Sequence, residues 1–493
     1  MDDAPRPSLS AHLIRGTAWG IVQVGAQKGC GLVSYLVLAY LLQPADLGAA
    51  TLAVSITAML TFVYPGAAGD LVVQRFGDGS TLVAAATRLA LLTGAGVMLL
   101  TAAVAPAVAS WNADGALIGL LVVASSRVLF EGLASVPQAI ARSELRFAYL
   151  SGVESAMAVL MLCLSVAAAA AGMGPYAIVL AAGLAGAARL AVMAWFRPWA
   201  WREPGAGRLA RRLWPDFRAG GSQHFLNGVS QNIDYVILSS FAGSAALGLY
   251  TIAYQLASMV AVVFSFTVGL VAQPLFTRLV DEPDRLRDAY MDTQAVGLAV
   301  SSVSAAAMAV LAPVAIPVML PERWSSAGWL LSVLALGFGL GSLQPIAQSL
   351  MRSQGEYRRV FRLQVVSAVV LGVLVLIGAW LAAAMGVAVA VAAATWINGI
   401  VHALVSVPGS SRKPMLARVA SGACCAVLAF GPAGLGLLVI ASGLMPWAPI
   451  GSVPAVVLQV LLVVLGVGVW WLVAGSMQPG LRAVLSQRVL GRR

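Results

Sequence analysis

The chain has 493 residues, of which 60% are hydrophobic and only 10% charged, and its mean hydropathy is +0.90. By length alone it would form two or three soluble domains, but this composition excludes that class and indicates a polytopic membrane protein. Its 30 basic residues, all arginine except Lys28 and Lys413, give a formal net charge of +11. Most of them fall in short loops between apolar segments, where orientation in a membrane explains them. No nucleic-acid partner is expected.

The four cysteines, Cys30, Cys163, Cys424 and Cys425, all lie inside apolar segments. No CxxC pair and no histidine partner accompanies them, so we expect no disulfide and no metal site, and nothing in the sequence requires a cofactor. The N-terminus lacks the short apolar core and small-residue cleavage site of a signal peptide. We therefore expect the first apolar segment to be retained as a membrane helix.

About fourteen apolar segments are long enough to cross a hydrocarbon core of about 30 Å, which requires about 20 residues in a helix. They are predicted at residues 17–42, 47–64, 81–108, 116–136, 148–171, 175–196, 219–241, 247–276, 296–320, 327–351, 361–385, 387–407, 417–442 and 456–477.

The distribution of basic residues predicts the orientation of these segments. With the N-terminus inside, alternate loops and both tails contain 25 of the 30 basic residues, whereas the opposite loops contain only Arg323. A count wrong by one helix would disturb this alternation. The sequence therefore predicts that both termini are cytoplasmic.

The chain also contains an internal repeat. Residues 45–53 read Ala-Asp-Leu-Gly-Ala-Ala-Thr-Leu-Ala, and 200 residues later 245–253 read Ala-Ala-Leu-Gly-Leu-Tyr-Thr-Ile-Ala. The same offset pairs Gln23 with Gln223 and Gln27 with Asn227. Because an even number of spans separates the copies, they should be parallel and related by an axis along the membrane normal, as in two-lobed transporters.

The repeat and the loops together predict the domain organisation. It comprises a cytoplasmic N-terminus (1–16), an N-lobe of six helices (17–196), a cytoplasmic inter-lobe linker (197–218), a C-lobe of six helices (219–410), two additional helices (411–477) and a cytoplasmic tail (478–493).

The loops argue against an enzyme. The outward loops have at most about a dozen residues, too few for an extracytoplasmic catalytic domain, and the inward loops carry no phosphate-binding glycine motif or metal-ligand cluster. The acidic run 281–284 is followed by arginines and is interpreted as a solvated helix end instead of a metal site. With three histidines in the chain, no nucleophile, base and orienting group can be assembled.

Charged residues inside membrane segments are costly and usually face a cavity or a partner. The first lobe contains Lys28, Arg88, Arg127, Glu131, Glu154 and Arg189, and the second contains Asp234. Arg127 and Glu131 are four residues apart on one helical face and are predicted to form a structural ion pair. Arg88 and Arg189 could equally extend to the lipid headgroups. Lys28 lies deeper, close to Gln23 and Gln27, and is predicted to line a cavity.

The seventh predicted span is the most polar one. It carries Ser222, Gln223, His224, Asn227, Ser230, Gln231, Asn232 and Asp234. Some of these residues could serve hydrogen bonding between helices, but its repeat partner, the first span, is also polar. This predicts a water-filled cleft with both spans on its walls. Gln344, Gln348 and His402 could join it or could make local hydrogen bonds. A cationic wall favours phosphate and amides favour sugars, which points to an anionic glycolipid.

Several motifs resemble a known family. Residues 231–238 and 247–254 resemble the central signature of the polysaccharide transporter, or oligosaccharide flippase (Wzx-like), family of the multidrug/oligosaccharidyl-lipid/polysaccharide (MOP) exporter superfamily. Leu47-Gly48, followed by residues 73–75, is similar to the first repeat of this family, and residues 352–358 are similar to its loop after the tenth helix. The resemblance covers roughly residues 10–410 and implies a MATE-like arrangement of the two lobes.

The resemblance implies a flippase that moves undecaprenyl-pyrophosphate-linked oligosaccharides across the bacterial inner membrane by alternating access. It would serve exopolysaccharide, capsule or O-antigen biosynthesis, with membrane lipids and a polysaccharide polymerase or export machinery as partners. The expected substrate-binding residues are Lys28, Gln23, Gln27, Arg127, Arg189, Asn227 and Gln231. Asp234 is the candidate site for a coupling proton or sodium ion, because an intramembrane carboxylate can bind either. It could equally accept hydrogen bonds from neighbouring groups.

Two alternatives remain open at this stage. A cation-coupled drug antiporter of the MATE type would need an acidic cavity, which the basic first lobe opposes. A membrane-embedded glycan polymerase or ligase would need larger outward loops than this chain has.

Overall fold

The computed structural model describes residues 9–61, 66–75, 79–112, 114–196, 203–269, 272–407 and 449–477, together with short pieces between 416 and 442. Within these ranges the secondary structure is helical and contains no strand. The predicted class, an all-α polytopic membrane protein, is confirmed. The chain divides into two compact units, Met1–Gly248 and Leu249–Arg493.

Among the described residues, nine helices are long and apolar enough to cross a membrane. Two of them contain a sharp kink: α8 (Ala206–Gly269) at Gly243, with φ 76°, and α13 (Tyr357–Val405) at Ala382 and Ala383. Each kink falls at or next to a predicted boundary between two spans. The fourteen spans stay a prediction, and the predicted span 417–442 lies mostly outside the described residues.

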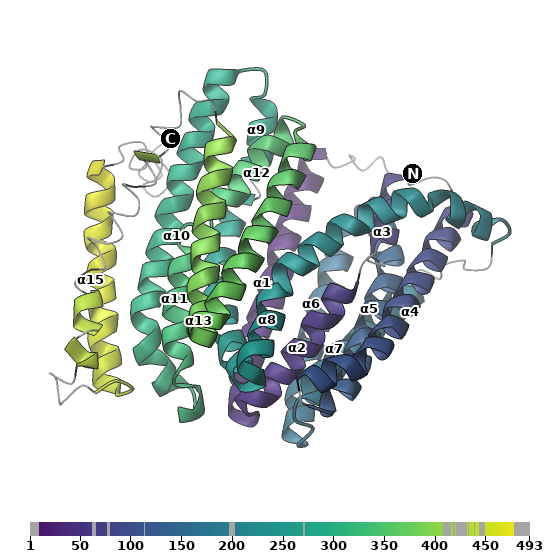
Figure 1. The fold of residues 1–493 in the computed structure, drawn as a ribbon. Helices are drawn as coiled ribbons and strands as arrows, with labels where there is room; N and C mark the ends of the chain where they lie inside the picture. Colours follow the sequence, from purple (N-terminus) through teal and green to yellow (C-terminus); the bar gives the residue numbers. More distant parts are fainter. Residues whose placement is uncertain are drawn as a thin grey trace, which may run out of the picture. The chain divides into compact units, whose positions relative to one another are not determined.

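The first unit is organised around one central helix. Its elements are α1 (Leu9–Leu41), α2 (Pro44–Leu60), α3 (Ala67–Gln74), α4 (Ser80–Trp111), α5 (Ala116–Ser143), α6 (Phe147–Ala170), α7 (Tyr176–Phe196) and α8 as far as Gly248. Helix α5 packs against α2, α3, α4, α6 and α7, while α1 packs against α6 (Figure 1). Helix α3 was not predicted, because it is a short element within an expected loop.

Small residues allow these helices to approach closely. The core between α3, α4, α5 and the start of α8 consists largely of alanines, with Leu213 and Phe217 contributed by α8. At the start of α2, Pro44 occupies the first turn, where its missing N–H costs nothing. The carboxylate of Asp46 accepts a hydrogen bond from the Gln43 N–H at 3.1 Å, which caps the same turn.

The second unit contains α9 (Ala272–Arg278), α10 (Pro283–Met319), a short 3-10 helix (Glu322–Trp324), α11 (Ala327–Phe338), α12 (Leu343–Ser353), α13 and α15 (Val453–Met477). Helix α10 packs against α11 and α15, and α13 packs against α11 and α12. The predicted span 327–351 is interrupted between Phe338 and Leu343. Helix α10 begins at Pro283, well before residue 296, so the acidic run 281–284 lies at its N-terminal end.

The two copies of the repeated nonamer contact each other within the first unit. A Cβ atom at Gly48 would collide with the backbone carbonyl of Ser244, and one at Gly248 would collide with that of Pro44. The two contacts are reciprocal, since each pairs residues that are related by the offset of 200. Such a reciprocal contact is the arrangement that a local two-fold axis produces.

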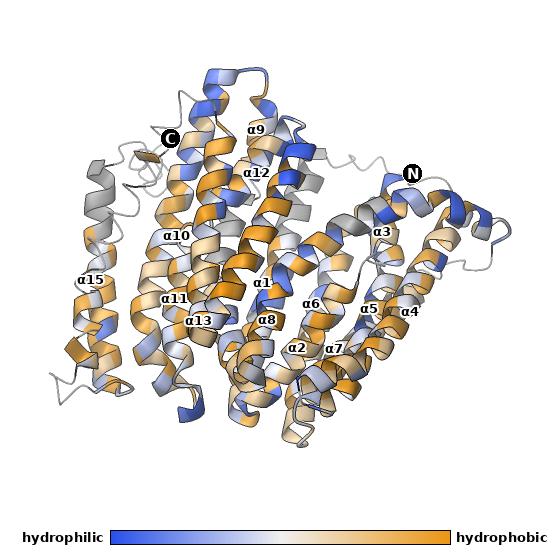
Figure 2. Cartoon of the chain, in the orientation of Figure 1, coloured by the Kyte–Doolittle hydropathy of each residue, from blue (hydrophilic) through white to orange (hydrophobic). Residues whose placement is uncertain are grey.

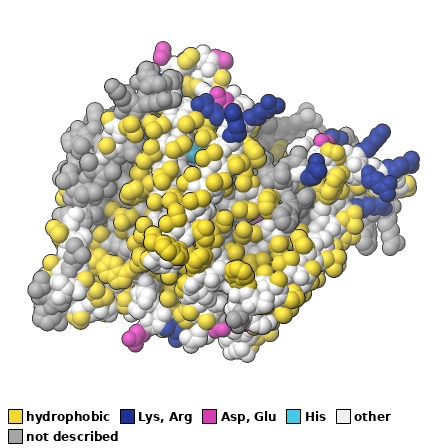
Figure 3. All heavy atoms as spheres, in the orientation of Figure 1, with side chains coloured by type: hydrophobic (Ala, Val, Ile, Leu, Met, Phe, Trp, Pro, Cys, Tyr) yellow, Lys and Arg dark blue, Asp and Glu magenta, His cyan; other side chains and the backbone are white. Residues whose placement is uncertain are grey.

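Hydropathy follows the helices in both units. The middle parts of the long helices are apolar, and hydrophilic residues concentrate near helix ends (Figure 2). On the face of the second unit seen in Figure 3, hydrophobic side chains cover the helices, and basic side chains gather where α12 ends and α13 begins. Arg352, Arg358 and Arg362 are the exposed arginines of this region.

Candidate functional site

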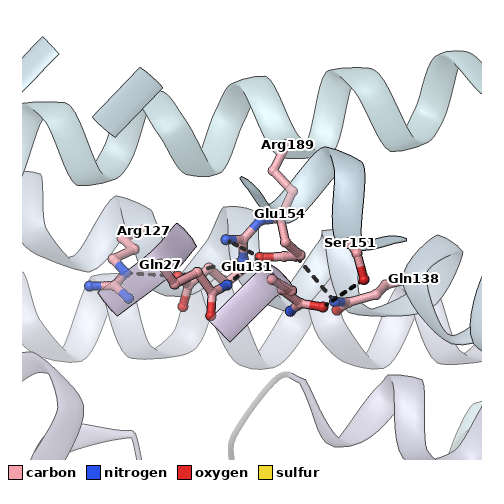
Figure 4. A network of polar contacts seen from close by, with 8 residues as sticks. Gln27, Arg127, Glu131, Gln138, Ser151, Glu154 and Arg189 are labelled. Carbon is pink, nitrogen blue, oxygen red and sulfur yellow. Dashed lines mark hydrogen bonds and ion pairs between the residues drawn. The ribbon is translucent and has the colours of Figure 1, made fainter. Parts of the chain in front are cut away.

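Four charged side chains form one network inside the first unit. Arg127 and Glu131 lie one turn apart on α5, and Arg127 Nε donates to Glu131 Oε1 at 2.8 Å. Arg189 on α7 connects the two carboxylates, because its Nη2 is 3.0 Å from Glu154 Oε2 and its Nη1 is 3.9 Å from Glu131 Oε1. Figure 4 shows the chain of contacts from Arg127 to Glu154.

Glu154 is the most buried member of the network, with a side-chain exposure of 4%. Its Oε2 also accepts a hydrogen bond from Gln27 Nε2 of α1 at 3.1 Å, and its Oε1 accepts one from Gln138 Nε2 of α5 at 3.2 Å. Gln23 extends this polar row along α1 and accepts a hydrogen bond from Ser151 Oγ at 3.5 Å. Helices α1, α5, α6 and α7 are thus connected through polar side chains in the interior.

The network contains two arginines and two glutamates, so its formal charge is zero when all four ionise. Burying a charge is costly unless it is paired and hydrogen-bonded, and here each carboxylate has at least one cationic partner. The pairing also shows that Arg189 reaches inward to Glu154 instead of extending to the headgroups. Its Nε is buried and has no hydrogen-bond partner among the described residues.

Two cavities flank this network. The first, here called the α1 cavity, has a volume of about 330 Å³ and lies between α1, α5, α6 and α7. Its polar end contains Gln27 and the four charged residues, and Ser34 and Ser165, whose hydroxyls are 3.1 Å apart, lie further along it. The remaining wall is apolar and includes Leu38, Met157, Met161, Leu162 and Ile178. The cavity therefore has one charged and one apolar region.

The second cavity, here called the α8 cavity, has a volume of about 440 Å³ and lies between α2, α5, α7 and α8. Its polar lining combines two threonines at the C-terminal end of α2, the Arg127–Glu131 pair, and His224, Asn227 and Asn232 of α8. Arg127, Glu131 and Ala182 line both cavities. The ion pair therefore stands at the boundary between the two.

The structure brings several of the predicted site residues together. Gln27, Arg127 and Arg189 line the α1 cavity, and Asn227 lines the α8 cavity with Arg127. Gln23 lies beside the network through Ser151. These five residues all belong to the first unit.

Other predicted residues lie elsewhere. Lys28 and Gln231 are exposed and line neither of the two cavities. Asp234 is buried at 4% exposure and also lines neither cavity. Gln344, Gln348 and His402 belong to the second unit, where Gln348 Oε1 accepts from Arg352 Nη2 at 3.3 Å.

Sequence reasoning omitted some residues from the site. Thr57 of α2 and Thr61, which directly follows α2, were not singled out, although both line the α8 cavity. Gln138 was missed because the predicted span ended at residue 136, whereas α5 continues to Ser143. Asn232 is one of several polar residues of its predicted span, and the sequence offers no signal that separates it from its exposed neighbour Gln231.

A second set of contacts ties α3 to the first part of α8. Arg75 Nη2 is 2.7 Å from Asp216 Oδ2, and His224 Nε2 is 3.2 Å from Asp70 Oδ2. All four side chains are between 44% and 54% exposed. His224 thus contacts α3 at the rim of the α8 cavity that it lines.

These features define the class of the protein as a multi-pass membrane protein with a transporter fold. The fold is similar to that of the lipid II flippase MurJ in an inward closed conformation, with a TM-score of 0.73 at 13% identity, covering 96% of this chain and 100% of that one. It is also similar to an inward-facing MATE family multidrug resistance transporter of the MOP superfamily, with a TM-score of 0.66 at 15% identity, covering 81% and 98%.

The chain belongs to the family described as "Polysaccharide biosynthesis protein", whose sequence pattern matches residues 37–328. It is 24% identical over 212 residues to the amylovoran biosynthesis protein AmsL of Erwinia amylovora, which is 42% of this chain and 54% of that protein. It is 27% identical over 115 residues to the teichuronic acid biosynthesis protein TuaB of Bacillus subtilis (strain 168). This alignment covers 23% of this chain and 24% of that protein. The aligned region thus spans about half of the length of AmsL and about a quarter of the length of TuaB. The family resemblance noted from the motifs is confirmed.

Proposed function

We propose that this protein is a flippase that translocates undecaprenyl-pyrophosphate-linked oligosaccharide repeat units across the bacterial inner membrane by alternating access. The observation that carries the proposal is the lining of the α8 cavity, which contains Arg127 together with the amides of Asn227 and Asn232. A guanidinium group suits phosphate, and amides with threonine hydroxyls suit sugar hydroxyls. The family membership and the polysaccharide-related names of two relatives support the same substrate class.

The protein would act in exopolysaccharide, capsule or O-antigen biosynthesis, and a polysaccharide polymerase or export machinery would use its product. Both termini are proposed to be cytoplasmic, because the loops on that side carry most of the basic residues. Asp234 is proposed as a site for a coupling proton or sodium ion, since it is a buried carboxylate on the helix that forms the cavity wall.

The test is deletion of the gene, followed by complementation. Lipid-linked repeat units should accumulate on the cytoplasmic face of the deletion strain, and the intact gene should restore surface polysaccharide. Complementation with Arg127→Met should fail, whereas Arg127→Lys, which keeps the charge, should restore part of the export. Normal surface polysaccharide in the deletion strain would refute the proposal.

The similarity in fold to MATE transporters makes drug antiport the second candidate. It would show as cation-driven efflux of organic cations from vesicles that contain the purified protein. Transfer of a labelled polyprenyl-pyrophosphate oligosaccharide between leaflets, without such efflux, favours the flippase. Formation of longer glycans by the purified protein would instead identify a polymerase or ligase.

A further inference from the structure

A directed series of hydrogen bonds in the core of the second unit connects α10 with the start of α12 and with the C-terminal end of α13. Ser406 Oγ donates to the Ala403 carbonyl at 3.0 Å, so the Tyr290 hydroxyl, 2.8 Å away, is the donor to Ser406. Tyr290 in turn accepts from Gln294 Nε2 at 2.9 Å, and the same Nε2 donates to the Leu343 carbonyl at 3.1 Å. Each polar hydrogen of the Ser406, Tyr290 and Gln294 side chains therefore has an acceptor.

His402 lies one turn before Ser406 on α13, and its side chain has no exposed surface. Its Nδ1 is 2.8 Å from the Asn398 carbonyl oxygen. A carbonyl can only accept, so Nδ1 carries the hydrogen and the neutral ring presents a lone pair at Nε2. Nε2 is buried and has no hydrogen-bond partner among the described residues.

The oxygen of Gln294 is in the same situation. The Leu343 carbonyl fixes the orientation of the amide, so Oε1 must be the other end of the group and can only accept. Oε1 is buried and has no partner within the described part of the chain. His402 Nε2 and Gln294 Oε1 are therefore two buried acceptors in the second unit, and neither has a donor among the described residues.

The helix register places these two groups at one level. Tyr290 on α10 pairs with Ser406, the residue that directly follows α13, and α10 and the second half of α13 run in opposite directions (Figure 1). Gln294 and His402 each lie one turn further from this pair, in the same direction. This face of α13 also adjoins Leu343, because a Cβ at Gly399 would lie 3.3 Å from Leu343 Cβ.

An unsatisfied buried acceptor costs about 1 to 3 kcal/mol. A proton on Nε2 would turn this acceptor into a donor, and Gln294 Oε1 is a buried acceptor at the same level of the core. We propose that His402 and Gln294 form a buried proton-binding site in the second unit. A proton from solution binds His402 Nε2, and the imidazolium donates to Gln294 Oε1 and to the Asn398 carbonyl. This inference does not rest on the proposed transport substrate.

The surroundings contain few other charged groups. Arg359, at the start of α13, donates from Nη2 to the Val405 carbonyl and from Nη1 to Glu356 Oε2 at 2.7 Å, so it is already paired. The buried side chains of α12 are all apolar, α9 contributes Phe276, and Tyr290 is the titratable residue among the buried residues of α10. Because His402 forms no ion pair with a carboxylate among the described residues, Gln294 is the group that would make a charged ring tolerable, since a buried charge needs hydrogen bonds.

The chain has three histidines, which allows a direct measurement. In a His12→Gln/His224→Gln background, His402 is the one remaining histidine, and ¹⁵N NMR of the protein in nanodiscs reports its protonation state. At about pH 8 the spectrum should show the neutral ring with hydrogen on Nδ1, and imidazolium should appear towards about pH 5. Gln294→Met should reduce the imidazolium fraction at about pH 5 by about tenfold, because a bond to a charged group is lost.

Tyr290→Phe is the matched control, because it removes a contact of Gln294 Nε2 and leaves Oε1 in place. Imidazolium should persist in this variant. Gln294→Asn, which withdraws the oxygen by one methylene, provides the same test if methionine packs poorly. A ring that stays neutral throughout the pH range in the parent, or an equal loss in Tyr290→Phe and Gln294→Met, would overturn the proposal. The readout does not involve transport, so it is independent of the flippase assay.

Discussion

Gly48 and Gly248 are related by the 200-residue repeat, and each lies against the backbone of the other copy. Gly48 faces the Ser244 carbonyl, and Gly248 faces the Pro44 carbonyl. Ser244 and Pro44 are themselves 200 residues apart. The shared glycine therefore has a physical reason: neither copy has room for a side chain where α2 and α8 meet. This contact supports a two-fold relationship between the copies.

Alanine at either glycine should destabilise the protein. The obstructing atoms belong to the backbone, so no side-chain rotation relieves the collision, and overpacking of this kind costs about 1 to 3 kcal/mol. Gly48→Ala and Gly248→Ala should both lower the apparent melting temperature in detergent. Gly152→Ala, where a Cβ meets nothing within 4 Å, is the matched control. Equal melting temperatures for Gly48→Ala and Gly152→Ala would contradict the contact.

Much of this arrangement could be predicted from the sequence, because hydropathy and basic residues report where helices begin and end. The helical class and most predicted spans follow from that pattern. The break in α13 illustrates the limit, since Ala382 and Ala383 are apolar, helix-favouring residues in which nothing marks the kink. The apolar stretch that contains the predicted spans 361–385 and 387–407 is too long for one crossing of the membrane, and this length is the reason for predicting two spans.

The site was less predictable, because it depends on which helices are neighbours. The four-residue spacing of Arg127 and Glu131 is local and can be read from one helix. The bridge from Arg189 to Glu154 joins α7 to α6 and requires their packing. Lys28 illustrates the converse: its depth suggested a cavity, but depth does not determine which face of a helix a residue occupies, and Lys28 is exposed.

Removing Arg189 should strongly destabilise the first unit. Arg189→Met leaves Glu154 without its ion-pair partner, and breaking a buried pair from one side costs about 3 to 5 kcal/mol. In the double variant Arg189→Met/Glu154→Gln both charges are absent, and the protein should recover part of its stability. Melting temperatures of Arg189→Met, of Glu154→Gln and of the double variant give the interaction between the two residues. Strictly additive losses would show that the two residues do not interact. The exposed pair Arg285–Glu282, replaced by alanines, should change little.

Lys28→Ala should impair transport and preserve membrane insertion and stability. The Lys28 side chain has no hydrogen bond or ion pair among the described residues, and Gly25 and Gly29 beside it adjoin open space. Its replacement therefore removes a charge without removing a contact. Lys28→Arg is the charge-preserving control and should retain most of the activity. Wild-type export by Lys28→Ala would exclude Lys28 from the mechanism.

Asp234→Asn should likewise impair transport while the protein inserts normally. The substitution keeps the size of the side chain but removes the negative charge through which a proton or sodium ion would be bound. Export by this variant should no longer respond to a proton or sodium gradient. Asp234→Glu, which keeps the carboxylate, should respond partly. A gradient response in Asp234→Asn equal to that of the wild type would exclude Asp234 as the coupling site.

Charge reversal at Arg75 and Asp216 tests whether the contact between α3 and α8 serves the transport cycle. The pair is about half exposed, with N and O atoms 2.7 Å apart, and exposed pairs contribute at most about 1 kcal/mol to stability. Arg75→Asp places two carboxylates side by side, so it should weaken the α3–α8 contact and reduce export while the melting temperature changes little. Adding Asp216→Arg recreates the attraction with exchanged partners and should restore export. If export recovers in the double variant, the two residues act through their contact with each other, because two unrelated defects would add instead of cancelling. Wild-type export by Arg75→Asp alone would show that the pair is dispensable.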